Sequence, residues 1–418
     1  MKKIPSFVYS FIRLLDYSFF FMKILMLTPY LPFPLLSGGQ TRSYNLLKNL
    51  SKKHDVTLFS FIRRDEEMQY KEELLKYCKK IELFKRRPAW SIVNILLAGF
   101  TKYPFLVAIY LSHTLQKTLR KELKDTTYDL IHAETFYVMP NIAAGKVPIL
   151  LVEQTIEYRV YQHFVQNSAP FFLRPLLWFD VWKVKYWEKH YWSKAKQVVA
   201  MSHADKDQMQ SVMPGLTVNI VPNGVDVTQF SARQNDNKKR KTILYVGNFK
   251  WLQNREAVVI LINEVWPKIK KEIQDVELRI VGRGLTPELK ALQTDEVIFD
   301  EHVHDIRSVY AEADLMIAPI EGPGGTRLKI LEAMASGCPV VTTHVGIEGI
   351  DAKHNQEVLV GRTSKDLALC AITLLKDTKL SQKLTQNAKK LVGNQYNWQD
   401  ITNELDRIYG EVAHGHKH

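Results

Sequence analysis

Short apolar runs separated by longer amphipathic segments recur through both halves of this 418-residue chain. Runs of this length are typical of strands covered on both faces, and strands that alternate with helices favour parallel sheets. The sequence therefore predicts two α/β domains, which a chain of this length can accommodate. The expected strands are Lys23–Thr28, Asp55–Phe61, Asp129–Ala133, Pro148–Val152, Gln197–Met201 and Val218–Val221 in the first half, and Thr242–Gly247, Glu277–Gly282, Val297–Phe299, Asp314–Pro319, Pro339–Thr343 and Val358–Val360 in the second.

A polar stretch without apolar periodicity, ending in the basic run Lys238–Lys241, separates the two halves. Such composition is typical of a solvated linker. We therefore expect a first domain over residues 22–230, a linker over 231–241 and a second domain over 242–394. The helical pattern in residues 395–418 is expected to form a terminal helix.

Composition narrows the class of protein. The apolar and charged fractions, 46% and 24%, are those of a soluble globular protein. A run of about 18 apolar residues is absent from the sequence, so we predict no transmembrane helix. Three well-separated cysteines favour a reducing compartment without disulfides, and cytoplasmic localisation is expected. The net charge of +13 favours anionic partners, but the sequence resembles no nucleic-acid-binding module.

Two segments carry the pattern of a membrane-surface contact. Residues 1–21 place Ile4, Phe7 and Phe11 on one helical face with lysines elsewhere, which suits the inner face of an anionic membrane. Translation from Met22, or packing of this segment on the domain, are the alternatives. The segment Phe171–Trp192 combines aromatic residues with lysines. For this second segment we expect instead a long helix whose aromatic face packs on the first domain.

The segment Ala318–Gly349 is the most informative about function. A buried strand is followed by Gly322, Gly324 and Gly325, where the missing Cβ lets the backbone approach a ligand. Thr326 is expected to cap the next helix, and Arg327 and Lys329 fall in its first turn. Cations at a helix N-terminus oppose the helix dipole, and a bound anion removes that conflict.

Glu332 adds a carboxylate to the same helix. It lies three residues after Lys329 and therefore on the same face. A carboxylate there can accept hydrogen bonds from a sugar diol while the cations hold phosphate. The pattern predicts a nucleoside-diphosphate site, and the alternative is a solvated helix with one ion pair after an ordinary turn.

Further candidate residues follow other predicted strands, where ligands of doubly wound sheets bind. Gly38 and Gly39 precede a helix and can offer backbone N–H groups to a phosphate or sugar. Gly247 and Gly282 follow two strands of the second domain and allow close approach of a nucleotide. Ordinary turns are the alternative for each. We predict no metal site, because His302 and His304 have no evident third ligand.

The string TRLKILEAMASGCPVV, from Thr326, resembles the donor-site signature of GT-B glycosyltransferases of the retaining family 4. The opening strand with Ser37-Gly38-Gly39, the segment Val221–Asp226 and the segment Tyr245–Phe249 are also similar to that family. One position departs from it. Much of the family carries two glutamates eight residues apart; Glu332 matches the second, but Gly324 stands at the first. Glu321, three residues earlier, is a candidate replacement.

The resemblance implies two Rossmann-like domains whose parallel sheets face each other across a cleft, with the terminal helix crossing back to the first domain. It implies transfer of a hexose-type sugar from a nucleoside-diphosphate sugar to a glycan or lipid-linked acceptor, with retention and without a metal or other cofactor. The donor would contact Gly38, Gly39, Gly247, Lys250, Gly282, Gly324, Gly325, Thr326, Arg327, Lys329 and Glu332.

The resemblance also implies two finer roles. Lys250 would help neutralise the diphosphate, with Arg255 as the competing residue. His132 would contact the transferred sugar, and His132 and Glu332 would be the catalytic residues. A hydrogen bond between His132 and Glu134 is the alternative for that histidine.

Two other functions fit parts of the pattern. A nucleotide-sugar epimerase can share this architecture, but it needs acid and base groups that the sequence does not supply beyond His132. A non-catalytic scaffold protein would be compatible with Gly324 in place of an acid. Arg327, Lys329 and Glu332 argue against a scaffold, so a glycosyltransferase is the leading prediction.

Overall fold

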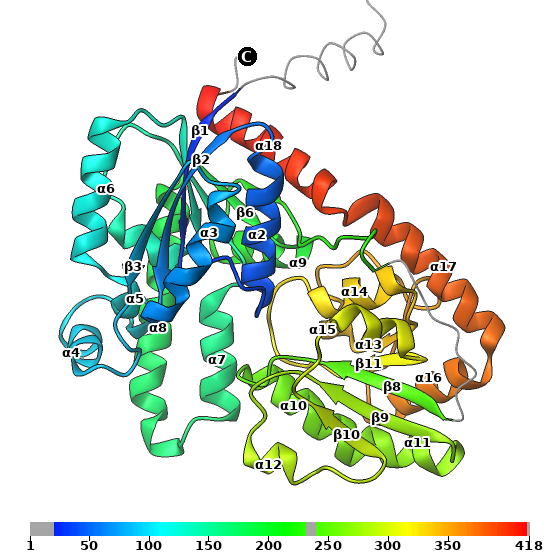
Figure 1. Ribbon diagram of the computed structural model, residues 1–418. Helices are drawn as coiled ribbons and strands as arrows, with labels where there is room; N and C mark the ends of the chain where they lie inside the picture. Colours follow the sequence, from blue (N-terminus) through cyan, green and yellow to red (C-terminus); the bar gives the residue numbers. More distant parts are fainter. Residues whose placement is uncertain (1–20, 231–239, 416–418) are drawn as a thin grey trace, which may run out of the picture.

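The computed structural model describes residues 21–230 and 240–415, and the structural statements below refer to these residues. Two α/β domains lie side by side (Figure 1). The first holds a seven-stranded sheet in the order β3-β2-β1-β4-β5-β6-β7, and the second a six-stranded sheet in the order β10-β9-β8-β11-β12-β13. The neighbouring strands of both sheets pair in parallel. The predicted fold class is confirmed.

The strands fall close to their expected positions, with one exception. The strand β3 was missed because it is an edge strand in which only Ile81 and Phe84 are buried, so its apolar signal is weak. The strands are β1 (Lys23–Thr28), β2 (Asp55–Ile62), β3 (Lys80–Lys85), β4 (Leu130–Glu134), β5 (Ile149–Glu153), β6 (Gln197–Ala200), β7 (Val218–Ile220), β8 (Lys241–Val246), β9 (Val276–Val281), β10 (Val297–Asp300), β11 (Leu315–Ala318), β12 (Val340–Thr342) and β13 (Leu359–Val360).

Helices cover both faces of each sheet, as right-handed crossovers between parallel strands require (Figure 1). In the first domain they are α2 (Gly38–Leu50), η1 (Asp65–Tyr70), α3 (Lys71–Leu75), α4 (Ile92–Phe100), α5 (Phe105–Tyr110), α6 (His113–Asp125), η2 (Phe136–Asn141), α7 (Glu157–Asn167), η3 (Phe171–Leu173), α8 (Arg174–Lys194) and α9 (His203–Val212). In the second they are α10 (Leu252–Ile260), the π-helical turn η4 (Leu261–Val265), α11 (Trp266–Glu272), α12 (Pro287–Lys290), α13 (Ile306–Glu312), α14 (Leu328–Ser336), α15 (His344–Ile347), α16 (Ser364–Lys376) and α17 (Thr378–Gln395).

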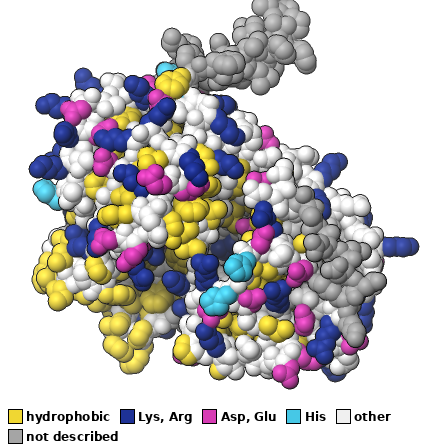
Figure 2. All heavy atoms as spheres, viewed as in Figure 1, with side chains coloured by type: hydrophobic (Ala, Val, Ile, Leu, Met, Phe, Trp, Pro, Cys, Tyr) yellow, Lys and Arg dark blue, Asp and Glu magenta, His cyan; other side chains and the backbone are white. Residues whose placement is uncertain are grey.

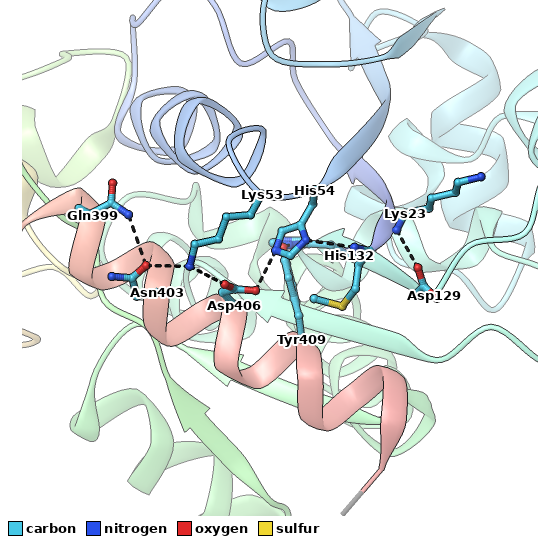
Figure 3. Close-up of polar contacts among 10 residues, drawn as sticks. Lys23, Lys53, His54, Asp129, His132, Gln399, Asn403, Asp406 and Tyr409 are labelled. Carbon is cyan, nitrogen blue, oxygen red and sulfur yellow. Dashed lines mark hydrogen bonds and ion pairs between the residues drawn. The ribbon is translucent and has the colours of Figure 1, made fainter. Parts of the chain in front are cut away.

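The last helix, α18 (Trp398–His414), returns to the first domain and packs beside α2 (Figures 1 and 3). Asp406 accepts from His54 Nε2 at 2.8 Å and pairs with Lys53 Nζ at 2.9 Å. Tyr409 is fully buried in the same contact. The two chain segments that pass between the domains also touch, because Val225 N donates to Tyr396 O at 2.7 Å. These contacts fix where the second domain is attached to the first.

Three sequence predictions concern segments that the structure does not describe or describes only in part. The amphipathic segment 1–21 lies outside the described residues except for Phe21. Most of the linker 231–241 and the last residues of the tail also lie outside them. Within the described ranges, the helices are all too short or too polar to cross a membrane.

Candidate functional site

The carboxyl edges of the two sheets face each other, and the loops that follow the strands meet there. The N-terminus of α2 lies against the N-terminus of α14: a Cβ on Gly38 would lie 3.3 Å from Leu328 Cδ1. Nearby, Asn248 Nδ2 donates to Leu36 O at 3.2 Å. The structure thus brings the glycine loop of the first domain and the glycine-rich segment of the second to one place.

The loop before α14 is held between the domains. A Cβ on Gly325 would overlap the carbonyl oxygen of Gln154 in the first domain. Thr326 Oγ1 donates to Met201 O at 3.2 Å, and Asn223 Nδ2 donates to Thr326 O at 3.2 Å. Glycine at position 325 is therefore what allows the two domains to approach this closely.

Thr326 does not cap α14, which corrects the sequence prediction. The N-cap residue is Arg327, with extended backbone and no side-chain cap, because the hydroxyl of Thr326 is directed to Met201 in the other domain. The first N–H groups of α14 are consequently without a side-chain cap in the described structure, and they are oriented for an anion.

Arg327 folds back over the glycine loop. Its Nη2 donates to Gly322 O at 2.7 Å, and burial lowers the pKa of the guanidinium. Gly324 has a φ of +151°, and a Cβ there would lie 2.5 Å from Arg327 Nη1. A side chain at position 324 would therefore move the guanidinium of Arg327, and the positive φ disfavours residues other than glycine there. Glu321 is exposed at the start of the loop.

Lys329 points to the second domain's own strand β8 and helix α10. Its Nζ donates to Asn254 Oδ1 at 2.7 Å and to Tyr245 OH at 3.1 Å, and it lies 4.4 Å from the centre of the Tyr245 ring. Burial, with a smaller effect of the neighbouring Arg327, lowers the pKa of Lys329 to about 7, although the side chain keeps some exposed surface. A buried cation of this kind gains from an anionic ligand.

Glu332 lies one turn further along α14. Its Oε2 accepts from Tyr310 OH at 2.9 Å. Burial raises the pKa of Glu332 to about 7, while Tyr310 and Lys329 act in the opposite direction. The helix therefore presents two cations and a carboxylate whose charge depends on what binds beside them.

The strand-end glycines of the second domain touch each other. A Cβ on Gly282 would overlap the carbonyl oxygen of Gly247, and its φ is +150°. Gly247 in turn packs on Asn254, the residue that holds Lys329. The structure thus connects Gly247 and Gly282 to the α14 cluster.

The two basic candidates near these glycines lie on either side of the same loop. Lys250 is exposed beside Gly284, where a Cβ would lie 3.0 Å from Lys250 Cγ. Arg255 Nη1 donates to Phe249 O at 3.4 Å. Of these two residues, Lys250 is the one whose side chain is exposed to solvent.

His132 lies inside the first sheet and not at its edge, which corrects the prediction that it contacts the sugar. It is in the middle of β4 and has no exposed surface. Its Nδ1 contacts Tyr409 OH of α18 (Figure 3), and its Nε2 is 3.1 Å from Glu134 Oε1. Both ring nitrogens are occupied by protein groups, so His132 positions α18 and Glu134. The contact between His132 and Glu134, which was the alternative prediction for this histidine, is present in the structure.

Sequence reasoning missed two polar residues on the first-domain side of the site. Gln154 Nε2 donates to Tyr30 OH and to Glu134 Oε2, each at 2.6 Å. A Cβ on Gly39 would lie 2.6 Å from Gln154 Oε1, so this residue packs directly against the predicted glycine loop. Their positions in the sequence could have indicated them, because Tyr30 follows β1 and Gln154 follows β5. Both residues therefore lie at the edge of the sheet where ligands of such sheets bind.

The described residues contain no group of three or more His, Cys, Asp or Glu side chains placed to hold a metal ion. Glu301, beside His302, instead pairs with Lys290 at 2.5 Å. Activity without a metal stays a prediction.

Two facing Rossmann-like domains, with an uncapped helix and its basic residues at their contact, define the class of GT-B glycosyltransferases. The family models agree: residues 36–229 match glycosyltransferase family 4, and residues 240–377 match glycosyl transferases group 1. Together the two matches extend over most of the chain. This protein belongs to glycosyltransferase family 4.

Similar proteins include both uncharacterised and characterised relatives. An uncharacterised 44.6 kDa protein in the cps region of Klebsiella pneumoniae is 22% identical over 92% of this chain and 98% of its own length. A phosphatidyl-myo-inositol mannosyltransferase of Mycolicibacterium smegmatis is 30% identical, but the match spans 46% of this chain and about half, 52%, of that enzyme.

Solved structures share the fold at low sequence identity. Anabaena HepE in complex with UDP and glucose superposes with a TM-score of 0.68 at 18% identity, over 94% of this chain and all of that one. Sucrose-phosphate synthase from Thermosynechococcus elongatus gives a TM-score of 0.70 at 17% identity, over 93% of this chain and 99% of that one.

Proposed function

We propose that this glycosyltransferase moves a hexose-type sugar from a nucleoside-diphosphate sugar to a glycan or lipid-linked acceptor, with retention of configuration and without a metal, in the synthesis of cell-surface polysaccharide. The observation that carries the proposal is the convergence of the uncapped N-terminus of α14, Arg327 and Lys329 at the contact between the domains.

The chemistry follows from the charges that must be stabilised. Breaking the bond between the anomeric carbon and the diphosphate oxygen leaves negative charge on the diphosphate. The N–H groups of α14, Arg327 and Lys329 would stabilise that charge through preorganised dipoles and cations. Glu332 would accept hydrogen bonds from the hydroxyls of the donor. Contact between the domains through Gly325 would exclude water and limit hydrolysis of the donor.

The relatives support the donor and acceptor classes. One structural neighbour was solved with UDP and glucose, which supports a nucleotide-sugar donor. The mannosyltransferase relatives are named for a phosphatidyl-inositol acceptor, which supports a glycolipid, and the Klebsiella relative lies in a cps region, which supports a role in surface polysaccharide. Retention is the expectation for this family, with attack of the acceptor on the face that the diphosphate leaves.

A thermal-shift panel of UDP, GDP, ADP and CMP, with EDTA present, tests the proposal. A ligand at about 100 times its Kd stabilises the folded state by about 2.7 kcal/mol, so one nucleoside diphosphate should raise the melting temperature by several degrees. Lys365→Ala removes an exposed lysine far along the chain in α16 and should leave the shift unchanged.

The absence of a shift with all four nucleotides would contradict a nucleotide-dependent enzyme and favour the scaffold alternative. Formation of an isomerised nucleotide sugar without acceptor would identify an epimerase.

Binding of that diphosphate should take up protons at pH 8. In the free protein, the pKa of Lys329 is lowered to about 7, so the amine is largely neutral at pH 8. A nearby anion raises this pKa, so a proton is bound with the ligand and affinity falls by up to about tenfold per pH unit above 7.

Calorimetric titration at pH 8, in buffers of different ionisation enthalpy, measures this uptake. Lys329→Arg keeps the charge at all these pH values and should flatten the pH dependence. An observed enthalpy that does not depend on the buffer would show that Lys329 is already charged in the free protein.

A further inference from the structure

The helix α4 has an inverted burial pattern. Its nine residues are almost all apolar, yet Asn94 is the residue that the structure buries. The amide of Asn94 donates to Pro88 O and Ala89 O and accepts from Arg87 Nε at 2.8 Å. The polar side of this helix therefore faces the protein, and its apolar side chains point away from it.

Aromatic and aliphatic side chains continue this surface onto η3 and α8. Figure 2 shows hydrophobic side chains gathered at the lower left of the molecule, where Figure 1 places α4 and α8. We call this the α4–α8 surface. Its protruding members include Trp90, Ile92, Phe100, Phe171, Phe172 and Trp182, which are 61–86% exposed.

The summed exposed area of these side chains is of the size of a large apolar patch. The five aromatic residues among these six expose on the order of 700 Å², given about 150–250 Å² for one such side chain. The largest apolar patch of a typical monomer is about 300–600 Å². On α8, Phe179, Trp182 and Tyr186 also stack on one another along the exposed side.

This surface is a fixed platform. Lys183 of α8 is buried, and its ammonium donates to the carbonyl oxygens of Ala98 and Tyr103. Trp187 Nε1 donates to Lys102 O at 2.8 Å, and Phe105 N donates to Asp180 Oδ1 at 2.9 Å. These bonds fasten the end of α4 to the middle of α8. The exposed rings are thus held outward by hydrogen bonds beneath them.

The charges on the platform have one dominant sign. Residues 86–105 contain no aspartate or glutamate. Lys102, Arg174 and Lys185 are exposed there, while Asp180 is directed inward to the backbone of Phe105. Aromatic side chains that protrude between lysines and arginines match the interface of an anionic bilayer, where each cation adds about 1 kcal/mol.

We infer that the α4–α8 surface docks this protein on an anionic lipid bilayer, with the aromatic side chains inserted at the headgroup level. The sequence expectation that the aromatic residues of 171–192 pack on the first domain holds for Trp187 and Trp192, which are buried, but not for Phe171, Phe172 and Trp182. The docking inference does not depend on the proposed function.

Its consequence for a lipid-linked acceptor does rest on that function. Helix α7 connects β5 to the platform and contacts the second domain through His163 and Glu256, 3.0 Å apart. The bilayer would therefore lie on the side of the first domain that carries α7, the helix that also contacts the second domain, and an acceptor within the bilayer would enter from that side.

Co-sedimentation with phosphatidylcholine vesicles, with and without phosphatidylglycerol, tests the inference on the full chain. The protein should sediment with the anionic vesicles, and the triple variant Phe100→Ser, Phe172→Ser, Trp182→Ser should reduce the partition coefficient by at least about tenfold. Leu369→Ser, which removes a 62% exposed leucine from α16, is the matched control and should bind as the wild type. Melting temperatures establish that each variant is folded.

Charge reversal provides a second test that leaves the apolar residues in place. Lys102→Glu with Lys185→Glu should weaken binding to the anionic vesicles, and Lys365→Glu should not. Wild-type protein that stays in the supernatant with anionic vesicles would overturn the inference. Retained binding by the triple variant would also overturn it and assign membrane contact to another segment, such as residues 1–20. Self-association through this surface without vesicle binding would identify a second copy as its partner instead.

Discussion

Lys329→Ala should lower turnover by about 100- to 1,000-fold, the usual effect of removing one preorganised group that stabilises charge in a transition state. The ammonium is held by Asn254 and Tyr245 beside the N-terminus of α14, so its position does not have to be organised when the diphosphate departs. Release of sugar from the nucleoside-diphosphate donor, followed with and without acceptor, measures this effect.

The matched control for this variant is Lys365→Ala, which removes an exposed lysine of α16. It should retain full turnover. Because Lys329 is a largely buried amine, the alanine variant is also expected to fold without loss of stability, since burial of that cation is costly. Unchanged turnover in Lys329→Ala would show that the leaving diphosphate lies elsewhere, and the assignment of the α14 cluster would be wrong.

Gly325→Ala should lower turnover by about 100-fold, because the added Cβ would overlap the carbonyl oxygen of Gln154 across the domain contact. Small displacements of groups that position a substrate have effects of about this size. The clash is between domains and not within either core, so the melting temperature should change little. Small-angle scattering should show a more open molecule.

Gly393→Ala is the matched control, since a Cβ at Gly393 in α17 meets no atom within 4 Å. It should leave turnover and shape unchanged. If Gly325→Ala were as active as the wild type, the close contact between the domains would not be required for catalysis. A large fall in melting temperature would instead place the effect of the substitution on folding.

The strands of both sheets were predictable because strands buried on both faces are almost continuously apolar, and this leaves a clear sequence signal. The edge strand β3 did not give that signal, since only Ile81 and Phe84 of its six residues are buried. The glycine loop and α14 were also predictable, because clustered glycines before a helix are a local signal: Gly324 adopts a positive φ, although the close approach that Gly325 permits is to the other domain.

The side chains that contact these elements could not be read from the sequence. Threonine is a residue type that commonly caps helices, yet the hydroxyl of Thr326 donates to Met201 O in the first domain. His132 stands in a strand that leads toward the site, but Tyr409, far along the chain, covers it. Gln154 and Asn254 have no distinctive pattern, and only the packing of the domains brings them to Gly39 and Lys329.

The sequence by itself determined the two parallel sheets, the family and the glycine loop that leads into α14, because local periodicity, glycines and charges near a helix N-terminus act over a few residues. The tertiary structure alone decided that Gly324 lies against Arg327, that His132 is buried and paired with Glu134, and that α4 turns its apolar side outward. These outcomes depend on contacts between residues distant in the chain. A sequence pattern fixes which face of a helix is apolar, but only the position of the neighbouring elements decides whether that face is covered.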